Sequence, residues 1–246
     1  GVVVSCNYYQ GPAMQVPVGH GRVSRYAWGK DYHKVLKKRL NGICQELGLA
    51  ESSYRVCVDS VPIPERSLAR AAGLGFIGKS CMLISPGIGT YTFLATLLLK
   101  PPTTTEVPVV LSSSTKSKCG TCKRCMNSCP TNAFISESRI DASKCISYLT
   151  IEKRGAHQDH EAKMLGNWLF GCDICQEVCP YNHVAIPQTK VVEFLAESGA
   201  GQSIDLSWLL EIRTDEKFVS YFGGTPIMRT KREGLLRNAC SIIGGS

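Results

Sequence analysis

Eight of the thirteen cysteines follow a spacing that can hold two iron–sulfur clusters. Four form a C-x2-C-x2-C-x3-C-P run, one stands alone, and three form a later C-x2-C-x3-C-P run. In such runs three closely spaced thiolates bind one [4Fe–4S] cluster, while the fourth crosses to the other cluster. The spacing therefore predicts two ligand quartets: Cys119, Cys122, Cys125 and Cys179 for the first cluster, and Cys129, Cys145, Cys172 and Cys175 for the second.

Zinc is the main alternative metal that these cysteines could bind, because C-x2-C pairs also build tetrahedral structural zinc sites. Zinc ribbons use pairs rather than triplets, however, and both terminal cysteines here precede a proline, Pro130 or Pro180, as iron–sulfur runs require. Disulfides are disfavoured because no secretory signal is visible. We therefore expect iron–sulfur clusters.

Asp59 is the carboxylate best placed for acid–base chemistry. It closes the short apolar run Val56-Cys57-Val58, which is strand-like. A carboxyl carried by a strand end into a largely apolar pocket is expected to have a raised pKa, and a protonated carboxyl can act as a general acid. The alternative is an aspartate that merely holds a turn at the strand end. The five histidines are scattered, and we expect them to be surface residues, His157 and His160 in a polar loop.

The composition indicates a globular protein whose first part is basic. A chain of 246 residues with 43% hydrophobic residues can bury a core. Its longest apolar stretch, residues 91–99, is about half the length that crosses a bilayer, so no membrane partner is expected. The chain begins without methionine in a strand-like run, which indicates a fragment.

The net charge of +8 is concentrated in residues 1–110, which hold 12 Lys and Arg against 6 Asp and Glu. Two aromatic residues, Tyr26 and Trp28, lie among these cations. This mixture favours a phosphate-rich partner with bases available for stacking, although a solvated basic helix face is the alternative. The cations concerned are Arg22, Arg25, Lys30, Lys34, Lys37, Lys38 and Arg39.

Hydrophobic periodicity predicts half of an α/β domain, a linker and a helical end. Helices are expected over residues 30–49 and 65–72, and strands over residues 55–58, 82–85 and 89–99. The first helix should bury one stripe, formed by Leu36, Leu40, Ile43 and Leu47. Residues 101–118 have the Thr-, Ser- and Pro-rich composition of a linker. Helical spacing recurs in three later stretches, residues 190–197, 206–213 and 231–243.

Residues 73–80, GLGFIGKS, match both the dinucleotide fingerprint G-x-G-x-x-G and the phosphate loop G-x-x-x-x-G-K-S. Both motifs need a strand before the glycines and a helix after them. Here an Ala- and Arg-rich helix precedes the glycines, so its dipole would point away from a phosphate. We therefore reject nucleotide binding and expect a helix cap followed by a tight loop.

Five stretches, taken together and in order, resemble the epoxyqueuosine reductase family. They are residues 23–33 (VSRYAWGKDYH), 58–60 (VDS) with Glu65 and Arg66, 73–79 (GLGFIGK), 145–152 (CISYLTIE) and 171–176 (GCDICQ). The resemblance implies a cobalamin-dependent iron–sulfur oxidoreductase. It would remove the epoxide oxygen of epoxyqueuosine at the tRNA wobble position, giving queuosine and water in the last step of queuosine biosynthesis. It also implies that Asp59 donates a proton, and that the corrin is contacted by Ser24, Asp59, Ser80, Leu83, Ser147 and Asp173.

The resemblance further implies an α+β architecture with three parts. Residues 1–110 would form a nitroreductase-like α/β cobalamin-binding domain that lacks its N-terminal segment. Residues 111–185 would form a two-[4Fe–4S] ferredoxin-type domain, and residues 186–246 a helical HEAT-like segment of about one repeat, where solenoids need several. The resemblance also implies a cytoplasmic monomer whose partners are the anticodon region of tRNA and an external electron donor.

Two other functions use part of the same features. Another corrinoid iron–sulfur reductase, such as a reductive dehalogenase, would share the cofactors but act on small halogenated molecules, which leaves the basic first part unexplained. A ferredoxin-type electron carrier would explain the cysteines alone. It gives no role to the segment around Asp59.

Overall fold

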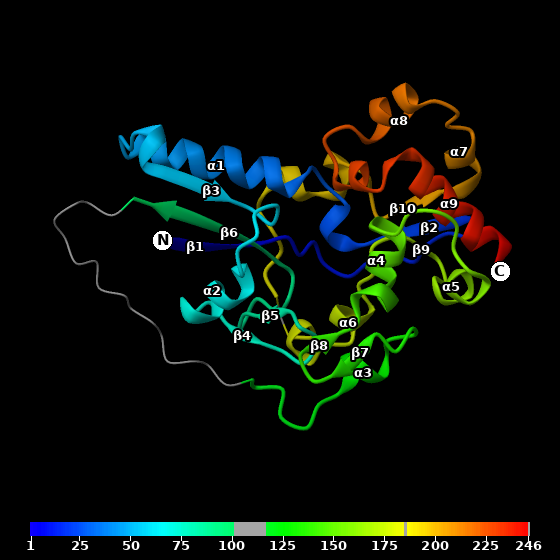
Figure 1. Cartoon of the computed structure of the whole chain (residues 1–246), viewed down its shortest axis with the longest axis horizontal. Coiled ribbons are helices and arrows are strands. Elements are labelled where there is room, and N and C mark those ends of the chain that lie inside the picture. The colour runs from blue at the N-terminus through cyan, green and yellow to red at the C-terminus, as the bar shows by residue number, and fades with distance from the viewer. Residues whose placement is uncertain (101–116, 185, 246) are drawn as a thin grey trace.

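The computed structural model describes residues 1–100, 117–184 and 186–245. An antiparallel sheet with the order β1-β6-β3 forms the N-terminal half; its strands are β1 (Val2–Asn7), β3 (Tyr54–Cys57) and β6 (Thr92–Leu99). The central strand, β6, pairs on both sides, and its Phe93, Ala95 and Leu97 are buried. Helix α1 (Tyr32–Glu46) contacts β3 and β6, while α2 (Glu65–Ala71) contacts β1 and β6. Figure 1 shows the two helices on either side of this sheet.

The predicted buried stripe of the first helix is only half right. Ile43 and Leu47 are 49% and 68% exposed. The line of contact with the sheet follows residues four apart along one ridge of the helix, so the position after Leu40 that meets the sheet is Cys44, and Ile43 points about 100° away from it. The buried residues of α1 are Leu36, Leu40 and Cys44.

A second sheet is assembled from three distant parts of the sequence. β2 (His20–Val23) pairs in parallel with β9 (Trp168–Phe170) and antiparallel with β10 (Ser203–Asp205). Gly21 makes the close approach possible, because a Cβ there would lie 2.6 Å from the Cβ of Leu169. The sheet therefore joins the N-terminal part, the cysteine region and the C-terminal part.

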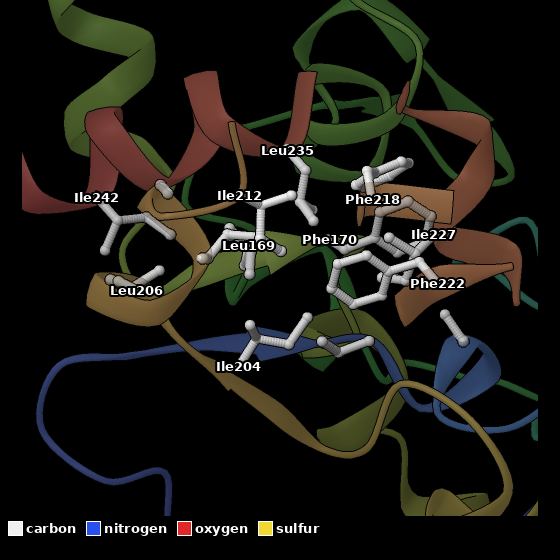
Figure 2. Close-up of a cluster of buried hydrophobic side chains, with 14 of the residues drawn as sticks. Leu169, Phe170, Ile204, Leu206, Ile212, Phe218, Phe222, Ile227, Leu235 and Ile242 are labelled. Carbon is white, nitrogen blue, oxygen red and sulfur yellow. The ribbon is translucent and has the colours of Figure 1, made fainter. Parts of the chain in front are cut away.

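The C-terminal part is mostly helical, with one expectation overturned. Residues 190–197 form two short 3₁₀ turns, Val192–Phe194 and Ala196–Ser198, and not a helix, because each turn ends in an extended residue or a glycine. The helices are α7 (Leu206–Leu210), α8 (Asp215–Phe222) and α9 (Lys231–Gly244). Figure 2 shows their apolar side chains, including Leu235 and Ile242, gathered around Leu169 and Phe170 of β9 in one core.

The cysteine region consists of short elements between these two halves. Its helices are α3 (Arg124–Asn127), α4 (Ile146–Ile151), α5 (Asp159–Met164) and α6 (Ile174–Glu177). Two hairpins adjoin them: β4 (Phe76–Ile77) with β5 (Leu83–Ile84), and β7 (Phe134–Ser136) with β8 (Arg139–Ile140). Because these elements are short, their positions depend on what they pack against: α3 contacts α6, and α4 contacts β9 and α9.

Two further observations concern segments singled out in the sequence. Most of the proposed linker, residues 101–118, lies outside the described residues. Among the helices that the structure describes, none combines the length and the apolar character needed to cross a membrane.

Asn238 of α9 should be essential for the C-terminal core. It is fully buried, and its amide donates to the carbonyl oxygens of Thr150 (2.7 Å) and Leu169 (2.9 Å). Asn238→Leu is close in size but leaves the buried carbonyl of Leu169 without this donor, while the carbonyl of Thr150 keeps its hydrogen bond from Thr230 Oγ1 (3.0 Å), so the free energy of unfolding should fall by about 2 kcal/mol. Denaturation of the anaerobic protein measures this. The exposed Asn127→Leu is the control and should change it by less than about 0.5 kcal/mol; equal effects would contradict the role of Asn238.

Candidate active site

The first predicted quartet surrounds one cavity. Cys119 and Cys122 lie in a loop, Cys125 lies on α3, and Cys179 follows α6. All four line a cavity of about 300 Å³. Gly78 lies near this quartet, since a Cβ there would be 3.6 Å from the Sγ of Cys119. The crossing of Cys179 to the first run, predicted from spacing, is thus present in the geometry.

The second quartet opens into a different, larger cavity of about 660 Å³. Cys129 and Cys145 come from the first part of the cysteine region, and Cys172 and Cys175 flank the start of α6. Burial, together with neighbouring thiols, raises the pKa of Cys175, and burial also raises that of Cys172. Thiolates crowded in this way need a bound cation to compensate their charge.

Both quartets fit iron–sulfur clusters by their chemistry. All eight cysteines are free thiols. Within the described ranges, no three His, Cys, Asp or Glu side chains form a group that could hold a metal ion. The sulfurs of each quartet instead line a cavity. Four thiols around a space is the donor set of a [4Fe–4S] cluster.

The larger cavity also collects the residues expected around the corrin. Ser24, Ser80, Leu83, Ser147 and Asp59 all line it. The remaining walls are largely apolar, with hydroxyl groups interspersed, which suits a large planar ligand that carries polar substituents. The lining includes apolar side chains from three segments, Ile63, Phe93, Leu94 and Ile146.

Asp173 lies behind the wall rather than in it. It is 2% exposed, and its carboxylate accepts hydrogen bonds from Ser24 Oγ (2.6 Å), from the backbone N–H of Arg25 (2.6 Å) and from Gln176 Nε2 (3.2 Å). Burial raises the pKa of Asp173, against the effect of the hydrogen bonds. Asp173 therefore fixes Ser24 and α6 relative to one another, and its side chain does not line the cavity.

The expectation of a raised pKa at Asp59 is wrong. The side chain is 64% exposed at the cavity rim, where its Oδ2 accepts a hydrogen bond from Tyr32 Oη (2.8 Å) and lies 3.4 Å from His33 Nε2. The hydrogen bond from His33 lowers the pKa of Asp59, and Tyr32 adds to this effect against the influence of burial. The strand end thus delivers Asp59 to the polar start of α1, not into an apolar pocket.

Asp59 also has an unusual backbone conformation. Its φ of 51° is in the left-handed region, which is uncommon for a residue other than glycine. The backbone N–H of Asp59 donates to Glu65 Oε1 (2.9 Å), which holds this turn against the start of α2. The conformation turns the carboxylate toward α1 and the cavity.

His33 is the site residue that the sequence analysis missed. It lies between two carboxylates, with Nδ1 2.7 Å from Asp31 Oδ1 and Nε2 3.4 Å from Asp59 Oδ2. Burial lowers the pKa of His33, but Asp31 and Asp59 outweigh it and raise the pKa to about 9. The expectation that it is a surface residue is therefore wrong. The sequence did contain a signal for this role of His33. Asp31 stands at the N-cap of a helix, where its side chain accepts a hydrogen bond from the backbone N–H of His33 and so holds that residue close to a carboxylate.

Of the two histidines expected in a surface loop, one is exposed and the other is partly buried. His160 is exposed, as expected, but His157 is partly buried and contacts Ser241 Oγ and the carbonyl of Leu149. Residues 73–80 follow helix α2, as expected, but they contain strand β4 and the start of its turn to β5 where only a tight loop was expected. Lys79 in this segment is buried, donates to the Gly120 carbonyl at 2.7 Å and pairs with Glu137 at 2.8 Å.

Comparisons with known proteins agree with this geometry. Residues 1–60 match the family model described as epoxyqueuosine reductase QueG, DUF1730, and residues 118–182 match the 4Fe-4S double cluster binding domain. An epoxyqueuosine reductase from Cyclobacterium marinum is 40% identical over 94% of this chain and 72% of its own length.

Solved structures show the same likeness. A crystal structure of epoxyqueuosine reductase with an epoxyqueuosine-modified tRNA-Tyr stem loop matches with a TM-score of 0.84 and 28% identity, over 99% of this chain and 63% of that one. A structure of the Bacillus subtilis enzyme, with an aspartate-bearing catalytic loop swung out of the active site, matches with a TM-score of 0.79 and 27% identity, again over 99% and 63%. The chain thus spans less than two thirds of the length of these solved proteins.

The charged state of His33 should make stability depend on pH. Its pKa in the folded chain, about 9, exceeds the ordinary 6.5, so its contribution to stability is complete below pH ~6.5 and is lost as pH rises through about 9. The melting temperature of His33→Gln should therefore lie below that of the parent at pH ~6, and the difference should shrink by pH ~10. His160→Gln is the control, and a constant difference for His33→Gln would contradict the assignment.

Proposed function

The chain belongs to the epoxyqueuosine reductase family, and we propose that it reduces epoxyqueuosine to queuosine at the wobble position of tRNA. One observation carries the proposal: Asp59 and the second cysteine quartet line the same cavity. A source of electrons and a route for protons therefore face one space. Removal of the epoxide oxygen requires both, because it takes up two electrons and two protons and releases water.

The two quartets would hold the clusters that supply the electrons one at a time. Cys129, Cys145, Cys172 and Cys175 would hold the cluster nearer the reaction, since their cavity is the one that Asp59 also lines. Bound cobalamin would supply an electron-rich cobalt centre for the epoxide carbon. The residues that would hold the corrin are Ser24, Ser80, Leu83 and Ser147, with Asp59 at the rim and Asp173 positioning Ser24.

Asp59 would deliver the proton to the departing oxygen, although it is ionised at rest. Its Oδ2 meets both Tyr32 and His33, which leaves Oδ1 to face the substrate. Burial raises the pKa of Tyr32, so this hydroxyl stays a hydrogen-bond donor. The proton would come from protonated His33, 3.4 Å away, and pass through the carboxylate. The exposed left-handed turn at Asp59 suits a movable loop, as in the Bacillus subtilis structure.

The basic face of α1 would contribute to binding the tRNA. Lys34, Lys38 and Arg39 are exposed on this helix, whose first residues contact Asp59. Lysine and arginine side chains there can contact backbone phosphates near the cavity. The structure of a relative with a modified stem loop supports this partner.

The finer architecture is part of the proposal. Residues 1–110 would form the nitroreductase-like cobalamin domain, residues 111–185 the ferredoxin-type domain and residues 186–246 a HEAT-like segment. The protein would act as a monomer in the cytoplasm, where tRNA is found. Helices α7, α8 and α9 around one core support a helical segment at the end of the chain.

Loss of one ligand should remove one cluster. After anaerobic reconstitution the chain should hold about eight irons and eight labile sulfides. Cys122→Ala should lower the iron content to about four, because the first quartet is then incomplete. Cys240→Ala, which changes an exposed cysteine outside both quartets, should keep the full content. A colourless protein with stoichiometric zinc would overturn the cluster assignment.

The function itself is tested at Asp59. Asp59→Asn preserves shape but cannot carry a proton, so turnover of an epoxyqueuosine-modified stem loop per bound cobalamin should fall by roughly 10² or more. Cluster and cobalamin content should not change. Asp159→Asn, at an exposed position on α5, is the matched control. If Asp59 merely holds a turn, the free energy of unfolding of Asp59→Asn should fall by about 1 kcal/mol while turnover stays near normal. That result would show that Asp59 does not donate the proton.

A further inference from the structure

The cavity of the first cysteine quartet has a positively charged mouth. Besides the four cysteines it is lined by Lys79, Lys118 and Arg124, and no acidic residue is among the described residues that line it. Lys118, Lys123 and Arg124 are exposed side chains on the loop and helix that carry Cys119, Cys122 and Cys125. We call these three cations the basic rim.

The side chains of the basic rim are not held in ion pairs. Among the ion pairs found within the described residues, none involves Lys118, Lys123 or Arg124. The acids of the cysteine region face other cations: Glu137 pairs with Lys79, Asp141 lies 3.9 Å from Lys144, and Glu177 pairs with Arg22. Lys118 and Arg124 therefore present unpaired positive charge at this opening, and Lys123, next to them in the chain, adds to it although Glu137 lies within its electrostatic influence.

The first quartet is also placed to receive electrons from outside. The second quartet opens into the cavity lined by Asp59, where the modified nucleoside would enter. The first quartet lines its own cavity. The quartets adjoin each other, since α3 contacts α6 and the thiols of Cys125 and Cys175 interact electrostatically. Electrons that enter at the first quartet can reach the second while tRNA covers the other cavity.

We propose that the basic rim docks an acidic one-electron carrier protein, such as a reduced ferredoxin, which passes its electrons to the first cluster. The proposal rests on the cluster assignment made above. Two carrier molecules each lose one electron per epoxide reduced, and the two protons come from water by way of His33 and Asp59. Opposite charges around an exposed redox centre steer encounter and orient the partner, which raises the association rate by about 10–10³ at low salt.

The experiment compares a protein carrier with a small reductant. In anaerobically reconstituted holoenzyme, Lys118, Lys123 and Arg124 are all changed to Glu, and cluster reduction is followed by stopped-flow absorbance with a reduced acidic [2Fe–2S] ferredoxin. We expect the second-order rate constant to fall at least tenfold at low salt, and its dependence on ionic strength to reverse or vanish. Reduction by photoreduced 5-deazariboflavin, a small uncharged reductant, should keep its rate. A matched variant changes three exposed cations elsewhere, Lys190, Arg213 and Lys217, to Glu, and should leave the ferredoxin rate unchanged.

Three outcomes would overturn the proposal. The ferredoxin rate could stay unchanged in the rim variant. The rates with ferredoxin and with uncharged photoreduced deazariboflavin could fall equally, which would mean that the substitutions act on the cluster and not on docking. Stem-loop affinity could fall tenfold with the ferredoxin rate intact, which would assign the rim to tRNA. Failure of the proposed function is recognised separately, because dithionite-driven reduction of epoxyqueuosine by the parent protein requires no docking.

Discussion

The buried carboxylate of Asp173 is the contact on which the cavity depends. It lies between two cysteines of the second quartet, and it binds Ser24 and the backbone of Arg25 at the other end of the sequence. A carboxylate that is 2% exposed is costly unless it is hydrogen-bonded, and here three donors meet it. The same contact therefore locks the cluster segment to the N-terminal half. Together with the pairing of β2 and β9, it sets the distance between the two walls of the larger cavity.

Arg25 extends this junction. Its guanidinium is buried among the rings of Tyr9, Trp28 and Tyr91, and it donates to the Gly11 carbonyl. Stacking of a planar cation on aromatic rings offsets part of the cost of burying it, although the buried Nε of Arg25 has no hydrogen-bond partner among the described residues. Its charge also acts on Asp173, where it favours the ionised form. The junction is thus both rigid and electrostatically balanced, although it lies beside a cavity open to solvent.

The sequence predicted well what depends on local spacing. The proposed quartets come from the number of residues between cysteines, and the four cysteines of each quartet line one cavity, with Cys179 beside the first run as that spacing predicts. Membership of Ser24, Ser80, Leu83 and Ser147 in the larger cavity came from the family resemblance and not from a pattern of their own. The protonation state of Asp59 could not be predicted, since it depends on His33 and Tyr32, which are more than twenty-five positions away and meet it only in the folded chain.

Because β2 pairs in parallel with β9, the second sheet can be completed only late in translation. Residues 20–23 leave the ribosome long before residues 168–170, so this ladder, and the neighbouring pairing with residues 203–205, cannot form during most of translation. Pairings between segments so far apart in sequence form late and slowly, because the loop must close before any contact rewards it. Ser24 follows β2 directly, and its partner Asp173 follows β9. A large cofactor can therefore enter a completed cavity only after synthesis has passed both strands, which excludes cofactor loading during the early part of translation.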